Sequence, residues 1–236
     1  MKYLLLFLAV ICGMWLLLGT PIAQDNSYHN FQDNNTLLAI PNFWNVVSNL
    51  PFLMIGIMAL IKIQWKSNDR LKTLKITLAT GILLTGLGSG FYHWHPKNFT
   101  LIWDRIPMTI VFTSFFFMLL YNRYKKKLIL KWFWPSIIIA AGTVFYWYLG
   151  ELHGKGDLRP YAIVQFAPIV ITLFMLFDLQ FLKQHKSILF AFLFYIIAKL
   201  LEHYDEQVAE FIFIGGHPLK HLFAALSCWF LVKEKE

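Results

Sequence analysis

Residues 74–93 read LKITLATGILLTGLGSGFYH, an apolar run with a serine at position 89 and a histidine at its end. A run of about 17–25 apolar residues can cross a lipid bilayer as a helix. Eight such runs recur along the chain: 3–19, 43–62, 74–92, 104–122, 131–149, 160–182, 187–204 and 217–232. The sequence therefore predicts an all-α integral membrane protein with eight spans.

The overall composition supports this prediction. Hydrophobic residues make up 58% of the 236 residues and charged residues only 14%, whereas about a quarter of a soluble domain is charged. No linker or low-complexity stretch separates the apolar runs. We therefore expect a single membrane domain over residues 1–236.

The basic residues predict the orientation of the spans. The net charge is +8, and the loops at 62–75 and 123–131 hold five basic residues each. If the spans alternate, fifteen basic residues lie on the side of the N-terminus and six on the other side. Because cytoplasmic loops carry the excess of Lys and Arg, both termini are expected in the cytoplasm. Basic charge that follows topology in this way does not indicate a nucleic-acid partner.

The first run has two interpretations. Lys2 followed by residues 4–18 resembles a signal peptide, but Pro21-Ile22-Ala23 lacks a small residue two positions before Ala23. We favour residues 1–22 as a retained N-terminal helix or signal anchor. Cleavage would leave seven spans and the same candidate site.

Five polar residues fall at one edge of the predicted bundle. His93 ends an outward-running span, Ser89 lies one turn deeper, and Asp104 opens the next span. Gly215-Gly216 precede His217 and His221, which are four residues apart on one face of the last helix. Ionisable groups inside a membrane are costly and usually functional. We expect a site on the extracytoplasmic side.

These residue types suit a metal-dependent hydrolase. Three neutral imidazoles, from His93, His217 and His221, can hold Zn²⁺ and leave a fourth position open for water. Asp104 could take a proton from that water, and Ser89 could donate to a developing oxyanion. Each residue also has a simpler explanation: a packed interfacial histidine, a Ser89 hydroxyl bonded to the backbone four residues earlier, or Asp104 as a helix N-cap.

Other polar residues are weaker candidates for a functional site. His95 lies two residues beyond His93 and precedes Pro96, which favours a place in an interfacial loop. Lys199 and Glu202 are three residues apart on a predicted helix, where they can form a local ion pair.

Four motifs occur in the same order as in a known family: FWNVVSN at 43–49, Gly88-Ser89 with His93, DRIPM at 104–108 and GHPLKH at 216–221. They resemble the alkaline ceramidases, members of a superfamily of seven-span membrane proteins that includes the progestin and adipoQ receptors. The resemblance covers residues 30–232, so residues 1–22 would add a helix before a seven-helix core. It implies Zn²⁺ held by His93, His217 and His221, with Ser89 and Asp104 assisting amide hydrolysis.

The resemblance is incomplete at two places. Alkaline ceramidases also hold Ca²⁺ with acidic residues before and within the first core helix. Here Asn42 stands where an acidic residue would precede Phe43, and only Asp33 is a plausible upstream ligand. Residues 93–96, HWHP, also replace the small and apolar residues that usually follow the first histidine.

The function predicted is a zinc-dependent intramembrane hydrolase. It would cleave the N-acyl amide bond of ceramide or a related lipid taken from the bilayer, releasing a fatty acid. Two alternatives are a receptor-like seven-span lipid-binding protein with a structural zinc, and a hydrolase of another acylated lipid. A structural zinc normally has four protein ligands, so three histidines favour catalysis.

Overall fold

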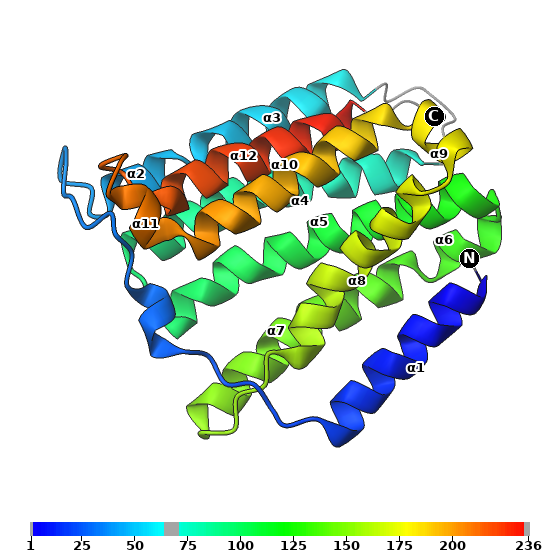
Figure 1. Ribbon diagram of the computed structural model, residues 1–236, viewed down its shortest axis with the longest axis horizontal. Coiled ribbons are helices and arrows are strands. Elements are labelled where there is room, and N and C mark those ends of the chain that lie inside the picture. The colour runs from blue at the N-terminus through cyan, green and yellow to red at the C-terminus, as the bar shows by residue number, and fades with distance from the viewer. Residues whose placement is uncertain (1, 64–70, 234–236) are drawn as a thin grey trace.

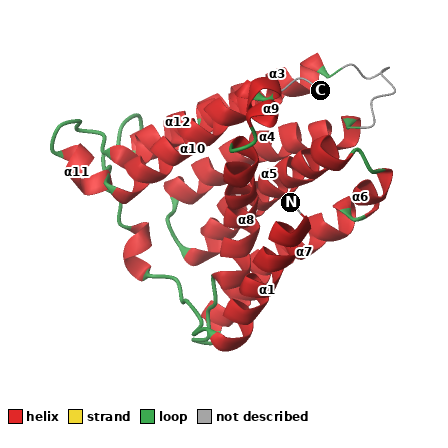
Figure 2. Cartoon of the chain, turned by 45° about the vertical axis from the view of Figure 1, so that its right-hand side comes forward, coloured by secondary structure: helices red, strands yellow, loops and turns green. Residues whose placement is uncertain are grey.

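The computed structural model describes residues 2–63 and 71–233, and these form helices joined by loops (Figures 1 and 2). The longer helices are α1 (Lys2–Leu18), α3 (Leu50–Lys62), α4 (Lys72–Trp94), α5 (Asn98–Tyr124), α7 (Phe133–Leu152), α8 (Arg159–Leu176), α10 (Lys186–His203) and α12 (Gly216–Val232). Short helices are η1 (Asn26–His29), α2 (Phe43–Val47), α6 (Lys127–Lys131), α9 (Leu179–Gln184) and α11 (Asp205–Ala209). In the described ranges the β-structure is one isolated bridge, between Leu37 and Ile40.

The lengths of the helices confirm an integral membrane protein that crosses the bilayer several times. Five segments in the described part of the chain are long and apolar enough to span: 43–62, α4, α5, α7 and α8. Helix α1 is apolar but shorter. The count of eight spans, made from the runs in the sequence, stays a prediction.

Three helix boundaries differ from the apolar runs. The run 43–62 is divided at Ser48 and Asn49 into α2 and α3. The run 160–182 is interrupted because the carboxylate of Asp178 accepts the backbone N–H groups of Gln180 and Phe181, which starts α9. Helix α5 begins at Asn98, so Asp104 lies well inside it and the N-cap explanation for Asp104 is wrong.

The helices pack in sequential pairs around α4 and α5. Helix α4 lies between α3 and α5, α10 packs along α12, and α5 also contacts α7 and α8. Apolar side chains that fill this arrangement include Leu74 and Ile82 of α4 and Leu119 of α5. Helix α1 packs against α8 at the margin of the bundle (Figure 1).

Residues 19–42, here called the connecting segment, join α1 to α2 and cross one end of the bundle (Figure 1). The guanidinium of Arg159 donates to the carbonyl oxygens of Trp15 and Gly19, at 2.8 and 2.5 Å. Burial of the Asp157 carboxylate opposes ionisation, yet hydrogen bonds from Arg159 and Ile22 hold its pKa below the usual value. The start of α8 therefore binds the segment through an ionised pair.

Candidate metal centre

Three histidines from two helices meet at one point. His93 comes from α4, and His217 and His221 come from α12. Their ring centroids lie 4.8–5.0 Å apart, and one nitrogen from each ring falls within 4.8 Å of the others. All three are at most 4% exposed. This cluster could hold a metal ion.

The start of α12 is fixed by its neighbours on α10 and α11. Gly215 has a φ of 78°, a left-handed conformation that glycine adopts without strain. Gly216 lies so close to the carbonyl oxygen of Leu201 that a Cβ atom would overlap it. The Asp205 carboxylate accepts the backbone N–H of His217 at 2.8 Å. Together these contacts hold His217 at the first turn of α12.

The donor set fits a metal such as zinc. His93 Nδ1 is buried and has no hydrogen-bond partner among the described residues. His221 Nδ1 lies 2.8 Å from the Ser48 hydroxyl, which orients this ring and leaves Nε2 as its ligand atom. Neutral imidazole nitrogen is a preferred zinc ligand. Ser48 was missed by the sequence analysis, although it lies in the quoted motif at 43–49.

The connecting segment covers the cluster. The Phe31 ring lies 4.6 Å from the His93 ring and 4.5 Å from the His217 ring, centroid to centroid. The His29 imidazole bonds the Tyr92 hydroxyl at 2.9 Å and the Asn98 side chain at 3.0 Å, while burial lowers its pKa. No pattern in the sequence indicated these contacts, because the segment has no helical periodicity to place it.

Ser89 and Asp104 come together through a close approach of α4 to α5. Pro107 has no N–H to offer the Trp103 carbonyl four residues earlier. Gly88 packs against that carbonyl so closely that a Cβ atom would overlap it. The neighbouring Ser89 consequently faces Asp104, and both side chains line the same cavity.

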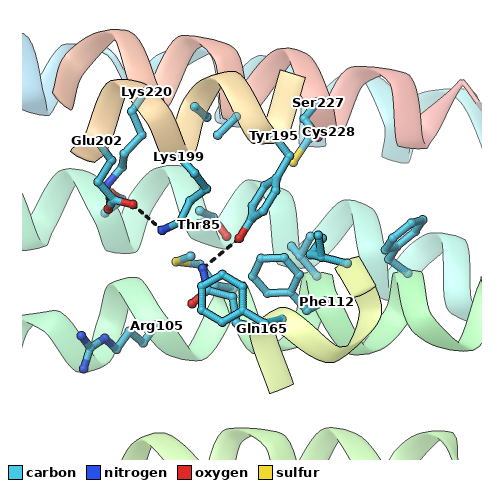
Figure 3. A pocket seen from close by; sticks show the side chains of 18 of the residues that line it. Thr85, Arg105, Phe112, Gln165, Tyr195, Lys199, Glu202, Lys220, Ser227 and Cys228 are labelled. Atoms are coloured by element: carbon cyan, nitrogen blue, oxygen red, sulfur yellow. Dashed lines mark hydrogen bonds and ion pairs between the residues drawn. The ribbon is translucent and has the colours of Figure 1, made fainter. Parts of the chain in front are cut away.

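A cavity of about 320 Å³ extends from these polar groups into the apolar interior. Ser89, Asp104 and His221 line one part of it, and Phe112 and Leu231 line another. Leu231 lies ten positions after His221 in α12, which is about 15 Å along the helix. Figure 3 shows the charged side chains gathered at one end and aromatic side chains at the other. Such a cavity suits a molecule with a polar head and a long apolar chain.

Three further charged residues form a connected group at the polar end. The Glu202 carboxylate accepts from Lys199 on its own helix, which confirms the predicted local pair, and from Lys220 of α12 at 2.7 Å. The Lys220 ammonium also lies 3.0 Å from His217 Nε2. Nothing in the sequence pairs Lys220 with Glu202, because the two residues are on different helices.

The residues that would hold calcium do not fit that ion. The two Asp33 carboxylate oxygens accept the backbone N–H groups of Asn35 and Asn45, at 3.3 and 2.9 Å. The Asn42 amide donates to the His93 carbonyl oxygen at 2.8 Å. Ca²⁺ takes 6–8 oxygen ligands, usually several carboxylates, and no group of three or more acidic side chains gathers around Asp33 in the described ranges.

These observations define the class of the protein: a multi-pass membrane protein with a buried three-histidine cluster at the polar end of an apolar cavity. The family model described as Ceramidase matches residues 25–232, and the chain belongs to the ceramidase family. That membership makes it an amidohydrolase. Comparisons with curated proteins and with solved structures found no match.

Proposed function

We propose that the protein is a zinc-dependent hydrolase that cleaves the N-acyl amide bond of ceramide or a related lipid. The observation that carries this proposal is the meeting of His93, His217 and His221 beside Ser89 and Asp104 at the head of an apolar cavity. Membership of the ceramidase family supports the same reaction.

Each polar residue has a role in this proposal. His93, His217 and His221 hold the ion, which when bound polarises the amide carbonyl and lowers the pKa of water. Asp104 accepts a proton from the attacking water as its oxygen bonds to the carbonyl carbon. The Ser89 hydroxyl donates a hydrogen bond to the carbonyl oxygen as negative charge develops there. The C–N bond then breaks, the amine takes the proton, and a fatty acid is released.

The proposed topology has eight spans in one membrane domain, with α1 added to a seven-helix core. Both termini would lie in the cytoplasm and the histidine cluster toward the extracytoplasmic side. The N-terminal end of α1 and the C-terminal end of α12 lie on the same side of the molecule as α6 and α9 (Figure 1). This arrangement supports an even number of crossings. The basic loops at 62–75 and 123–131 support the orientation.

Labelling of single cysteines in intact cells should report this orientation. Lys155→Cys, in the exposed loop between α7 and α8, should react with a thiol reagent that cannot cross the membrane. Lys127→Cys, exposed in α6, should react only after the cells are opened. The two native cysteines are replaced by serine in both variants. The reverse pattern would mean that the histidine cluster faces the cytoplasm.

Incubation with defined lipids tests the reaction. Purified full-length protein loaded with zinc should release free fatty acid and an amine from an N-acyl lipid, as measured by mass spectrometry. Protein treated with a chelator should release neither, and added zinc should restore the reaction. Absence of release from ceramides and from other N-acyl lipids by the zinc-loaded protein would contradict the proposal.

A further inference from the structure

The wall of the cavity carries polar groups among its apolar side chains. Four side chains with a hydroxyl group line the cavity from the interior of α4, α8, α10 and α12: Thr85, Thr172, Tyr195 and Ser227. A polar group that is unpaired in an apolar environment raises the free energy, so each hydroxyl proton needs an acceptor. The acceptor of each proton decides which hydroxyl group is available to a lipid inside the cavity.

Three of the four hydroxyl groups are bonded to the backbone. Thr85 and Thr172 donate to the carbonyl oxygen four residues earlier in their own helices, at 2.9 and 2.7 Å. Ser227 donates to the carbonyl oxygen of Ala191 in α10, at 2.7 Å. Because a hydroxyl group has one proton, these three have no donor left for a ligand.

The hydroxyl group of Tyr195 is bonded differently. It accepts a hydrogen bond from the side-chain amide of Gln165 in α8, at 3.0 Å, and its own proton has no acceptor among the described residues. The Gln165 carbonyl oxygen also has no hydrogen bond there, and it is not one of the fully enclosed atoms, so it is open to the cavity. If the amide is turned over, Tyr195 donates and the amide keeps two free N–H groups. In either orientation the pair can bond a further polar group.

The pair lies part of the way along the cavity (Figure 3). Tyr195 precedes Lys199 by about one turn of α10 and Glu202 by about two, which is about 6 and 10 Å along the helix. The Phe112 ring lies beside Tyr195, with 5.9 Å between the centroids, and the cavity continues to Leu231. A lipid with its amide at the histidine cluster would therefore bring the middle of a chain to this pair.

The bond between Gln165 and Tyr195 also joins α8 to α10, as polar side chains often join helices within a membrane. A bond between helices needs no free donor or acceptor on the wall of a cavity, however. A saturated hydrocarbon chain would leave these groups unpaired, whereas a hydroxyl group on the chain would satisfy both of them.

We propose that Tyr195 and Gln165 form a subsite for a hydroxyl group in the middle of the lipid chain that occupies the cavity. The chain is the acyl chain of an N-acyl lipid or the chain of its amine part. Its hydroxyl group accepts from the Tyr195 phenol and donates to the Gln165 carbonyl oxygen. The proposal rests on the proposed amide hydrolysis and names a substrate class for it. Both residues determine specificity and neither takes part in bond cleavage.

Lipids that differ by one hydroxyl group test the subsite. The plain lipid is a ceramide with two saturated chains. Two mid-chain analogues carry a hydroxyl group at the eighth carbon of the acyl chain or at the tenth carbon of the amine part, and a third analogue carries it at the second carbon of the acyl chain. We expect kcat/KM to be about 3- to 10-fold higher for one mid-chain analogue than for the plain lipid, because one hydrogen bond contributes a net factor of this size. Equal or lower values for both mid-chain analogues, or the same gain for the third analogue, would overturn the subsite and leave the amidase intact.

Tyr195→Phe assigns the preference to this side chain. Phenylalanine keeps a ring beside Phe112 but has no hydroxyl group, so the gain in kcat/KM for the preferred analogue should disappear. Gln165→Met removes the other half of the pair and should have the same effect. A bond that only joined the helices would lower both values together and leave their ratio unchanged. Tyr146→Phe removes a hydroxyl group from an exposed tyrosine of α7 and should keep the ratio. An unchanged ratio in folded Tyr195→Phe and Gln165→Met variants would contradict the assignment.

Binding separates the subsite from the reaction. Each lipid is added to the purified protein in nanodiscs, and the rise in Tm is measured with and without zinc. The preferred mid-chain analogue should raise the Tm of the wild-type protein more than the plain lipid does, and Tyr195→Phe should remove the difference. If no lipid is cleaved, the proposed function fails while this comparison still decides the subsite. Equal rises in Tm for the plain lipid and both mid-chain analogues would reject it.

Discussion

Asp104→Asn is expected to lower kcat for N-acyl amide hydrolysis by about 10²–10⁴-fold while the bound zinc is retained. The carboxylate is the group proposed to accept a proton from the attacking water, and general-base assistance contributes a factor of this size. Asparagine has nearly the same shape but cannot take that proton. The measurements are single-turnover release of fatty acid and zinc content per protein in the same preparation.

Two comparisons make this result specific. Asp178→Asn changes an equivalent charge beside Arg123, near the start of α9, and should leave kcat near the parental value. Ser89→Ala should cost about 10²–10³-fold if its hydroxyl stabilises the oxyanion. Parental turnover in a zinc-loaded Asp104→Asn variant would remove Asp104 from the mechanism, although the hydrolase itself would stand.

Replacement of any one of His93, His217 and His221 by alanine is expected to remove most of the zinc. Three nitrogen ligands leave no protein group to compensate for a lost one, and with the ion the reaction should be lost as well. Metal analysis of the purified variants gives the zinc content directly, and the parent should carry about one ion.

His95→Ala is the matched control for these variants. His95 lies two residues beyond His93, is exposed, and is not a member of the cluster. The His95→Ala variant should bind zinc and hydrolyse lipid as the parent does. Full zinc occupancy in all three cluster variants would show that the metal is held elsewhere.

Much of the fold follows from local patterns in the sequence. Apolar runs of bilayer length, such as 74–92, mark helices because backbone polar groups within a membrane must be paired internally. The points where these apolar runs are interrupted were harder to predict. Asp178 ends an apolar run because its side chain caps the next helix, and that capping depends on side-chain geometry that hydropathy does not record.

The candidate site was predictable to the extent that it lies on helices. Spacing four residues apart puts His217 and His221 on one face, and alternating direction brings His93 to the same depth. The contacts of Phe31, Ser48 and Lys220 were not predictable in this way. Each joins segments far apart in the chain, and the packing of α4, α12 and the connecting segment decides which residues meet.

The covering of the histidine cluster by Phe31 affects how fast an ion can exchange. The connecting segment is tied down at several points, among them the bond from its Gln32 N–H to Asp205 and the bonds of His29 to Tyr92 and Asn98. A chelator that arrives from the side covered by Phe31 reaches His93 and His217 only when this segment opens locally. For exchange by that route, the opening rate of a loop limits how fast the ion leaves, whatever its equilibrium affinity.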